Sequence, residues 1–276
     1  MKSRENAAGV GILGILGILV LLPLAAVLFQ ILCPGLQLEK FDLKNLSLVL
    51  DVFVRPLWKK AFLNSFFLSS GTTAIGLVLA AILAHIRTRY QFAGAKLLDL
   101  TAWILMIMPS FLLAQGWVYF SSSNGIASAW LGIPGVGSFV FSYWGLVTVM
   151  VLCKFPMAYV TIKTSLEWYP ARLMYAARMN GASSFHAWRT IQLPLCIPAY
   201  CSAAMLIFMD TVGDYGMSST ITAVYSFPTL PYTIYSAICS SPARFDMAGV
   251  LSLYLMVMIV IAMAVQCGAM GKKKFD

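Results

Sequence analysis

Three charged side chains lie in or beside strongly apolar segments of the sequence. Lys154 lies in VLCKFPMAY, and Asp210 and Asp214 lie in FMDTVGDYG. A charge within the hydrocarbon layer of a membrane is costly, so such residues are functional candidates by default. By Coulomb attraction, two carboxylates suit a cationic ligand and an ammonium suits an anionic one. The three residues are therefore candidates for a polar path.

Depth along the apolar segments argues against a direct ion pair between Lys154 and Asp210. A helix rises 1.5 Å per residue, which places Lys154 about 16 Å below the outer end of its segment and Asp210 about 3 Å below its own. We expect Lys154 to face either a water-filled cavity or a polar group of a partner. A structural niche from which its ammonium snorkels is an equal alternative.

Other chemistry has little support in the sequence. His85 and His186 are its two histidines, and no nucleophile with a base and an orienting group can be identified. The G-x-x-x-x-G-K-[ST] loop that binds nucleotide phosphates does not occur. The six cysteines form no CxxC pair, so neither a zinc site nor a disulfide framework is indicated. We expect no catalytic site and no metal site, which disfavours a membrane-embedded enzyme acting on lipid.

Composition identifies the environment that must position these residues. Of 276 residues, 60% are hydrophobic and 11% are charged, whereas soluble domains have about 25% charged residues. The net charge of +9 would suggest nucleic acid in a soluble protein, but here the basic residues flank apolar segments. The sequence therefore predicts an all-α integral membrane protein.

Six segments have the roughly 20 apolar residues that a transmembrane helix needs. They are Gly9–Cys33, Ala61–Ile86, Leu97–Phe120, Tyr143–Leu166, Leu195–Val212 and Met247–Met270. With both termini on the cytoplasmic side, twelve of the nineteen Lys and Arg residues lie inside, six lie outside and one lies within a span. This excess supports cytoplasmic termini under the positive-inside rule.

Small residues and prolines modify the predicted spans. Gly76, Ala80 and Ala84 form a small-xxx-small series that favours close helix packing. Prolines within or near spans tend to kink or interrupt helices, and interrupted helices at membrane depth line protein-enclosed or water-filled paths. Such prolines include Pro109, Pro156, Pro194 and Pro198.

A basic segment, residues 167–193, separates the fourth and fifth spans. Pro170 suits the first turn of a helix through 171–180 that stops at Gly181. Ser183 or Ser184 can cap a second short helix that ends at Thr190. The result is a helix pair along the inner membrane surface. Contact with anionic lipid headgroups and docking of another protein are both consistent with its basic and small residues.

The spacing within this segment resembles a known motif. Ala176-Ala177, three residues, Gly181, nine residues and then Ile191-x-Leu193-Pro194 resembles the EAA motif of ABC importer permeases. The similarity extends over residues 63–266 and implies the MetI-like permease fold with six transmembrane helices. It also implies that the coupling helix docks on a separate ATP-binding subunit. Tyr175 stands where the family usually has an acid. The implied ATPase-coupling residues are Tyr175, Ala176, Ala177, Gly181, Ile191, Leu193 and Pro194.

The resemblance also implies the setting of the chain. It predicts a multi-pass protein of the bacterial inner membrane with residues 1–60 as a first span and outer loop. Residues 61–276 would form the core permease domain, with the coupling loop at 167–193. The implied partners are two ATP-binding subunits, a second permease subunit, an extracytoplasmic substrate-binding protein and membrane lipid, without nucleic acid. No cofactor is expected on this chain, because ATP and Mg²⁺ would belong to the partner.

The resemblance bears on cargo through FMDTVGDYGMSSTI, Phe208 to Ile221. Its Asp214-Tyr215-Gly216 resembles an acid-aromatic-glycine pattern of the permease branch for ferric iron and its relatives. This adds Tyr215 to the path candidates and favours ferric iron as cargo. Polyamine, 2-aminoethylphosphonate and thiamine are the alternatives.

Overall fold

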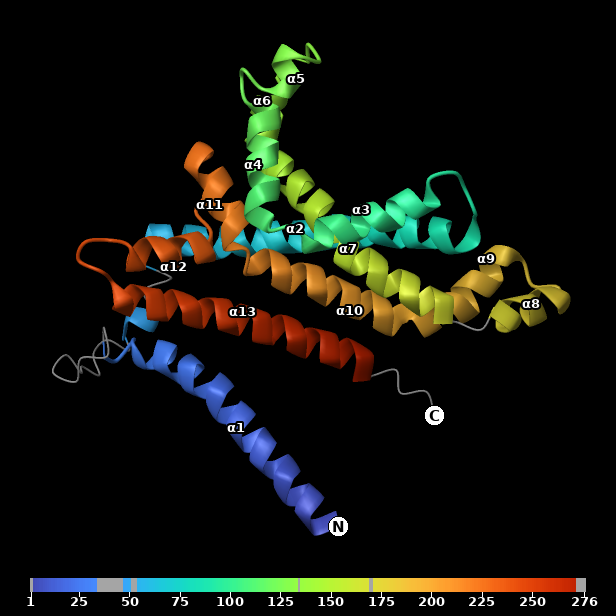
Figure 1. Ribbon diagram of the computed structural model, residues 1–276, viewed down its shortest axis with the longest axis horizontal. Coiled ribbons are helices and arrows are strands. Elements are labelled where there is room, and N and C mark those ends of the chain that lie inside the picture. The colour runs from blue at the N-terminus through green and yellow to red at the C-terminus, as the bar shows by residue number, and fades with distance from the viewer. Residues whose placement is uncertain (1, 34–46, 51–53, 134, 169–170, 272–276) are drawn as a thin grey trace. The chain divides into compact units, whose positions relative to one another are not determined.

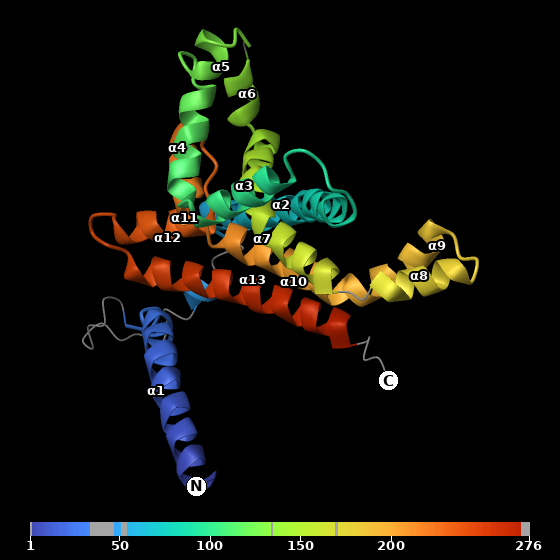
Figure 2. The same ribbon diagram turned by 45° about the vertical axis from the view of Figure 1, so that its right-hand side comes forward.

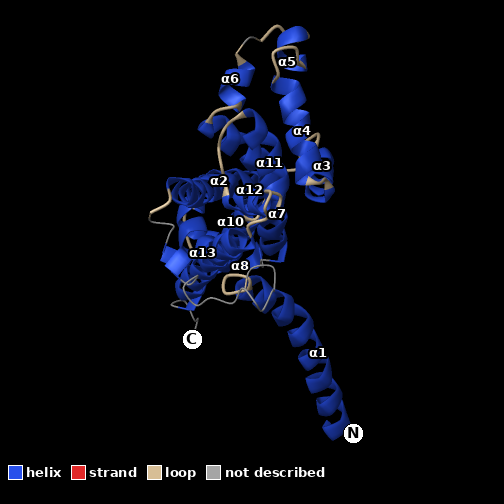
Figure 3. Ribbon diagram, turned by 90° about the vertical axis from the view of Figure 1, so that its left-hand side faces the viewer, coloured by secondary structure: helices blue, strands red, loops and turns tan. Residues whose placement is uncertain are grey.

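The computed structural model describes residues 2–33, 47–50, 54–133, 135–168 and 171–271. All regular elements in these ranges are helices (Figure 3). The chain divides into two compact units, one of Met1–Phe62 with Pro228–Val257 and one of Leu63–Phe227 with Met258–Asp276. The second unit contains both segments that carry the predicted functional residues.

Four described helices are long and apolar enough to cross a membrane. They are α2 (Pro56–Arg89), α7 (Tyr143–Trp168), the continuous helical segment Ser184–Val212 and α13 (Phe245–Gly271). A fifth crossing is possible if the bent pair Ala95–Ile107 and Ser110–Ala129 is one broken span. In α1 (Lys2–Phe29), the apolar part Leu13–Val27 is shorter. The prediction of an all-helical, multi-pass membrane protein is confirmed.

Close packing of α2, α7 and α10 (Leu193–Val212) forms one core of the larger unit (Figure 1). Ala80 and Ala84 of α2 are fully buried. A Cβ atom on Gly76 would lie 3.2 Å from Ile207 Cδ1, so the small residue admits the α10 side chain. The predicted packing role of this small-residue series is confirmed.

The predicted third span is interrupted at Pro109. Helix α3 (Ala95–Ile107) ends before Met108, whose φ of −67° and ψ of 132° are extended, and α4 (Ser110–Ser121) begins directly after the proline. The segments Ala95–Ile107 and Ser110–Ala129 differ in direction by 108°. A residue before proline is disfavoured in the α region, which explains the break. Pro156 and Pro198, by contrast, lie inside α7 and α10.

The bend turns α4 toward a second core, which contains α11 (Tyr215–Val224) (Figure 2). Ala114 of α4, Val147 of α7 and Met217 of α11 are fully buried in it. The short helices α5 (Ile126–Ala129) and α6 (Val136–Val140) follow α4 in the chain. The sequence patterns did not identify α5, α6 or α11, because helices of four to ten residues have no membrane-length apolar signal.

The smaller unit contains α1, α12 (Leu230–Ile238) and the first part of α13. Gly249 of α13 faces the end of α1, since a Cβ atom there would lie 3.0 Å from Ile31 Cγ1 and 3.2 Å from the Val27 carbonyl oxygen. The Tyr254 hydroxyl donates to the Val49 carbonyl oxygen at 2.7 Å. Apolar packing and this hydrogen bond both contribute to the stability of the unit.

Candidate functional site

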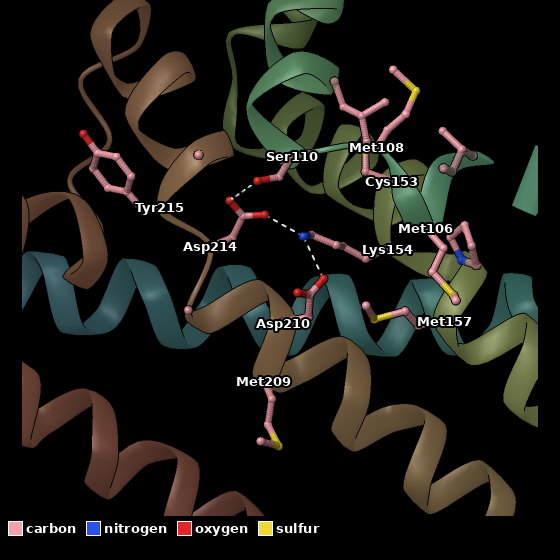
Figure 4. Close-up of a pocket in the computed structure, with 15 residues that line it drawn as sticks. Met106, Met108, Ser110, Cys153, Lys154, Met157, Met209, Asp210, Asp214 and Tyr215 are labelled. Atoms are coloured by element: carbon pink, nitrogen blue, oxygen red, sulfur yellow. Dashed lines mark hydrogen bonds and ion pairs between the residues drawn. The ribbon is translucent and has the colours of Figure 1, made fainter. Parts of the chain in front are cut away.

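The three charges of the apolar segments meet at one point (Figure 4). Lys154 Nζ of α7 lies 2.7 Å from Asp210 Oδ2 of α10 and 2.6 Å from Asp214 Oδ2. Asp214 is the residue directly before α11. One ammonium thus joins the end of α10 and the start of α11 to α7.

The expectation of no direct pair between Lys154 and Asp210 is wrong. The depth estimate assumed that the outer ends of the two helices lie level. Helix α7 instead begins eleven residues before Lys154, about 16 Å at the helical rise. This first part lies beside α4 and α6 (Figures 1 and 2), beyond the end of α10. Lys154 therefore reaches the level of Asp210.

Asp214 is the most firmly held member of this cluster. Its Oδ1 accepts a hydrogen bond from the Met217 backbone N–H at 2.8 Å, as an N-cap does, and another from Ser110 Oγ at 2.9 Å. Its side chain is 2% exposed, against 9% for Lys154 and 35% for Asp210. Sequence reasoning missed Ser110, although the proline before it signalled the helix break that places it here.

Gly216 permits the close approach of α11 to α4. A Cβ atom at this position would lie 2.6 Å from Ser110 Oγ and 3.0 Å from the Phe111 backbone nitrogen. We expect Gly216→Ala to lower the free energy of unfolding by about 1–3 kcal/mol, the usual cost of overpacking. Thermal unfolding of the detergent-purified chain measures this.

The matched control for that substitution is Gly116→Ala. Gly116 lies within α4, and a Cβ atom there would meet nothing within 4 Å. Alanine is the better helix former, so this variant should be unchanged or slightly more stable. Equal midpoints for the two variants would refute the close approach at Gly216.

The ion cluster lines a cavity of about 400 Å³. Tyr215 lines it as well, so all four predicted path candidates lie at one cavity. Its remaining wall is rich in sulfur. The sulfur-bearing lining residues are Met106, Met108, Cys153, Met157 and Met209. Within the described ranges, no group of three or more His, Cys, Asp or Glu residues is placed to hold a metal ion.

The coupling loop contains the predicted helix stop. Helix α8 (Ala171–Met179) is followed by Gly181 with a φ of +85°, in the left-handed region. The Gly181 N–H donates to the Arg178 carbonyl and the Ala182 N–H to the Ala177 carbonyl, each at 3.1 Å. These two bonds form a Schellman motif. The predicted helix and its glycine stop are confirmed, while Pro170 lies outside the described residues.

The second predicted helix of this loop is not a separate element. Ser183 caps α9 (Ser184–Ala187) by accepting from the His186 N–H at 3.2 Å, as predicted. The chain then continues through the π-helical turn η4 (Trp188–Gln192) directly into α10. Pro194 cannot donate a backbone hydrogen bond and crowds the preceding turn. A widened π turn relieves this crowding without ending the helix.

Two contacts anchor this turn to the end of α2. Arg89 Nη2 donates to Gln192 Oε1 at 3.0 Å, and Trp188 Nε1 donates to His85 Nε2 at 3.4 Å. His85, which the sequence left without a role, is therefore part of the anchor. A force on α9 would be transmitted to both α2 and α10.

Three of the seven predicted coupling residues are exposed. Ala176 and Gly181 are exposed, and 63% of Tyr175 is accessible. Ala177, Ile191, Leu193 and Pro194 are half-buried. Met179 and Phe185 add further exposed apolar surface, at 89% and 67%. The loop thus presents small and apolar residues around a tight turn.

Sequence reasoning missed a second ionic cluster, centred on Asp99 of α3. Its carboxylate lies 2.9 Å from Arg87 Nη2 and 2.8 Å from Lys163 Nζ, and it accepts from the Tyr159 hydroxyl at 2.6 Å. The cluster joins α2, α3 and α7. One feature of the sequence could have indicated this cluster: Asp99 is an acid near the start of an apolar segment, twelve residues after Arg87.

Comparison with known proteins identifies the protein family to which this helical chain belongs. Residues 76–267 match the family model described as "binding-protein-dependent transport system inner membrane component". The match covers more than half of the chain, and the chain therefore belongs to this family of ABC importer permeases. The resemblance inferred from the EAA-like spacing is confirmed, as is the location in a membrane as a multi-pass protein.

Individual relatives differ in their cargo. The molybdenum transport system permease protein ModB of Escherichia coli is 28% identical over 195 residues, 68% of this chain and 82% of the relative. The trehalose transport system permease protein SugB of Mycobacterium tuberculosis is 28% identical over 183 residues, 66% of this chain and 62% of that protein's length. The spermidine/putrescine permease PotC of Haemophilus influenzae is 29% identical over 63% of this chain and 61% of the relative. These relatives are transport permeases rather than enzymes.

A solved structure confirms the fold. The crystal structure of a bacterial ABC transporter that imports the acidic polysaccharide alginate matches with a TM-score of 0.69. The match covers 96% of both chains at 14% sequence identity.

Proposed function

We propose that this chain is the membrane-spanning permease subunit of an ATP-binding cassette importer, coupled through residues 167–193 to a separate ATP-binding subunit. The observation that carries the proposal is the tight turn at Gly181. It exposes small and apolar residues, and the adjoining α9–η4 segment is anchored to both α2 and α10. Motion of a partner bound at this turn would therefore reach helices that contribute to the core.

The partner set follows from the family and from one solved relative. An alginate ABC transporter has been crystallised with a pentasaccharide-bound periplasmic protein, which supports a substrate-binding protein as a partner here. We further propose two ATP-binding subunits and a second permease subunit, either a second copy or a paralogue. ATP and Mg²⁺ belong to the ATP-binding subunits, and this chain holds no cofactor.

The membrane topology of the proposal has six spans with both termini in the cytoplasm. It takes α1 as the first span and the bent pair of α3 and α4 as the third. Residues 1–60 then provide the first span and outer loop, and residues 61–276 form the permease core. The distribution of Lys and Arg supports this orientation.

A positively charged cargo is favoured within this function. The cluster has two carboxylates and one ammonium, so its net charge is −1. The resemblance of Phe208–Ile221 to the iron-transporting branch makes ferric iron the first candidate from sequence. Polyamine, 2-aminoethylphosphonate and thiamine are alternatives, and a spermidine/putrescine permease is among the relatives.

Reconstitution with candidate partners tests the proposed function. The chain is co-purified with an ATP-binding subunit and placed in vesicles with a substrate-binding protein. We expect ATP hydrolysis to rise at least severalfold when the loaded binding protein is added, because outward docking biases the permease conformation. A chain that assembles with no ATP-binding subunit would contradict the proposal.

A further inference from the structure

The charged residues that line the cavity beside Lys154 have a net charge of −1, because two carboxylates face one ammonium. Lys154, Asp210 and Asp214 are the only Lys, Arg, Asp or Glu residues among its described lining residues. Asp214 is almost fully buried and forms the shorter contact with Lys154, so this pair is neutral by itself. Asp210 is the surplus carboxylate. In a membrane interior, an unbalanced charge is costly unless a counter-charge is supplied.

Asp210 is also the member of the cluster that a ligand can reach. Lys154 approaches one of its oxygens, Oδ2, and 35% of the side chain is exposed, against 2% for Asp214. Figure 4 shows Asp210 below Lys154, with the Met157 side chain to one side. A cation entering the cavity can therefore bind Asp210 while the Lys154–Asp214 pair remains intact.

The sulfur-rich wall indicates what kind of cation fits. Methionine side chains are apolar, flexible and polarizable, and they adapt to ligands of irregular shape. Ferric iron requires several hard oxygen donors, whereas thioethers are soft ligands. Here both carboxylates already contact Lys154, and four of the other twelve lining residues are methionines. An alkyl chain would pack on this wall, and an ammonium at its end would bind Asp210.

We infer that this cavity is a binding site for an organic ammonium group, with Asp210 as the residue that binds the cation. The inference rests on the proposed importer function and narrows its cargo from any cation to an organic amine. Lys154 is a positioning residue that balances the charge of the buried Asp214 and contacts Asp210 through Oδ2. The site thus disfavours bare ferric iron as the occupant.

The test is direct binding to the purified permease complex in detergent. Isothermal titration uses three probes: spermidine, ferric ion supplied as its citrate complex, and molybdate. We expect spermidine to bind and Asp210→Asn to weaken its affinity at least tenfold, because asparagine has the same shape but no charge. Asp246→Asn is the matched control, since Asp246 is a carboxylate of the other unit that faces Arg244 at 3.4 Å. It should bind spermidine as the unmodified complex does.

Several outcomes would overturn the inference. The first is an equal affinity for spermidine in Asp210→Asn and in the unmodified complex. The second is the absence of spermidine binding. The third is an equal loss of spermidine affinity in Asp210→Asn and Asp246→Asn. Binding of ferric citrate or molybdate that depends on Asp210 or Lys154, in place of spermidine, would also overturn it. None of these results bears on the coupling loop, so the importer function is judged separately by ATPase stimulation and by the Gly181 variants.

Discussion

Gly181→Arg should reduce transport by the assembled complex at least tenfold while ATP hydrolysis by the partner continues. A Cβ atom at Gly181 meets nothing within 4 Å in the isolated chain, so the chain itself has room for the new side chain. In the complex, the arginine would lie where the proposed ATP-binding subunit docks. The φ of +85° adds strain of roughly 1–2 kcal/mol for a residue with a Cβ atom. Parallel assays of uptake and ATP hydrolysis in vesicles measure the uncoupling.

Two controls separate docking from backbone strain. Gly181→Asn places a residue that tolerates the left-handed region at the same turn, and transport should be largely kept. Gly94→Arg is the second control, because it adds the same side chain at another left-handed glycine, with φ of +96° and nothing within 4 Å of its Cβ position.

Ala177→Glu is a second uncoupling variant. It adds charge to the half-buried part of the turn and should uncouple the complex as Gly181→Arg does. Normal transport in both uncoupling variants would contradict docking at this turn.

Lys154→Met should strongly destabilise the larger unit. It leaves Asp210 and Asp214 facing each other without a cation, and Asp214 has almost no access to water. Removing one partner of a buried ion pair costs about 3–5 kcal/mol. The midpoint of thermal unfolding in detergent should fall accordingly, and a purified chain with an unchanged midpoint would refute the structural role of Lys154.

A double variant identifies the cause of that loss. Lys154→Met combined with Asp214→Asn removes the buried carboxylate together with its cation and should recover a large part of the stability. Lys154→Met combined with Asp210→Asn should recover less, because Asp210 is the more exposed acid. Recovery in the opposite order would indicate that Asp210, rather than Asp214, depends on Lys154.

Local sequence signals predicted the coupling loop well. The Asn180-Gly181 stop and the Ser183 cap depend on residues within one or two turns of each other, and both occur in the structure. The small-residue series of α2 was also predictable, because helical periodicity alone places Gly76, Ala80 and Ala84 on one face.

The sequence predicted which charged residues belong to the ion cluster, but it did not predict that they are in contact. Lys154 and Asp210 were recognised as charges in apolar segments, but their contact depends on how far α7 extends past α10. That offset is a tertiary property, set by the packing of α7 beside α4 and α6. Ser110 joins the cluster because Pro109 breaks the third apolar segment, and the direction of the resulting bend is not encoded locally. The continuity of α9 with α10 was missed for a related reason, since Pro194 is tolerated after a π turn.

Cysteine cross-linking at position 176 tests the central claim most directly. The exposed native thiols Cys239 and Cys267 are first replaced by serine, and Ala176→Cys is compared with Ser123→Cys, an exposed position between α4 and α5. In the assembled complex, a short bifunctional reagent should join position 176, and not position 123, to the ATP-binding subunit. The account is contradicted if position 176 captures no ATP-binding subunit, or if it reacts only with reagents added outside the cell.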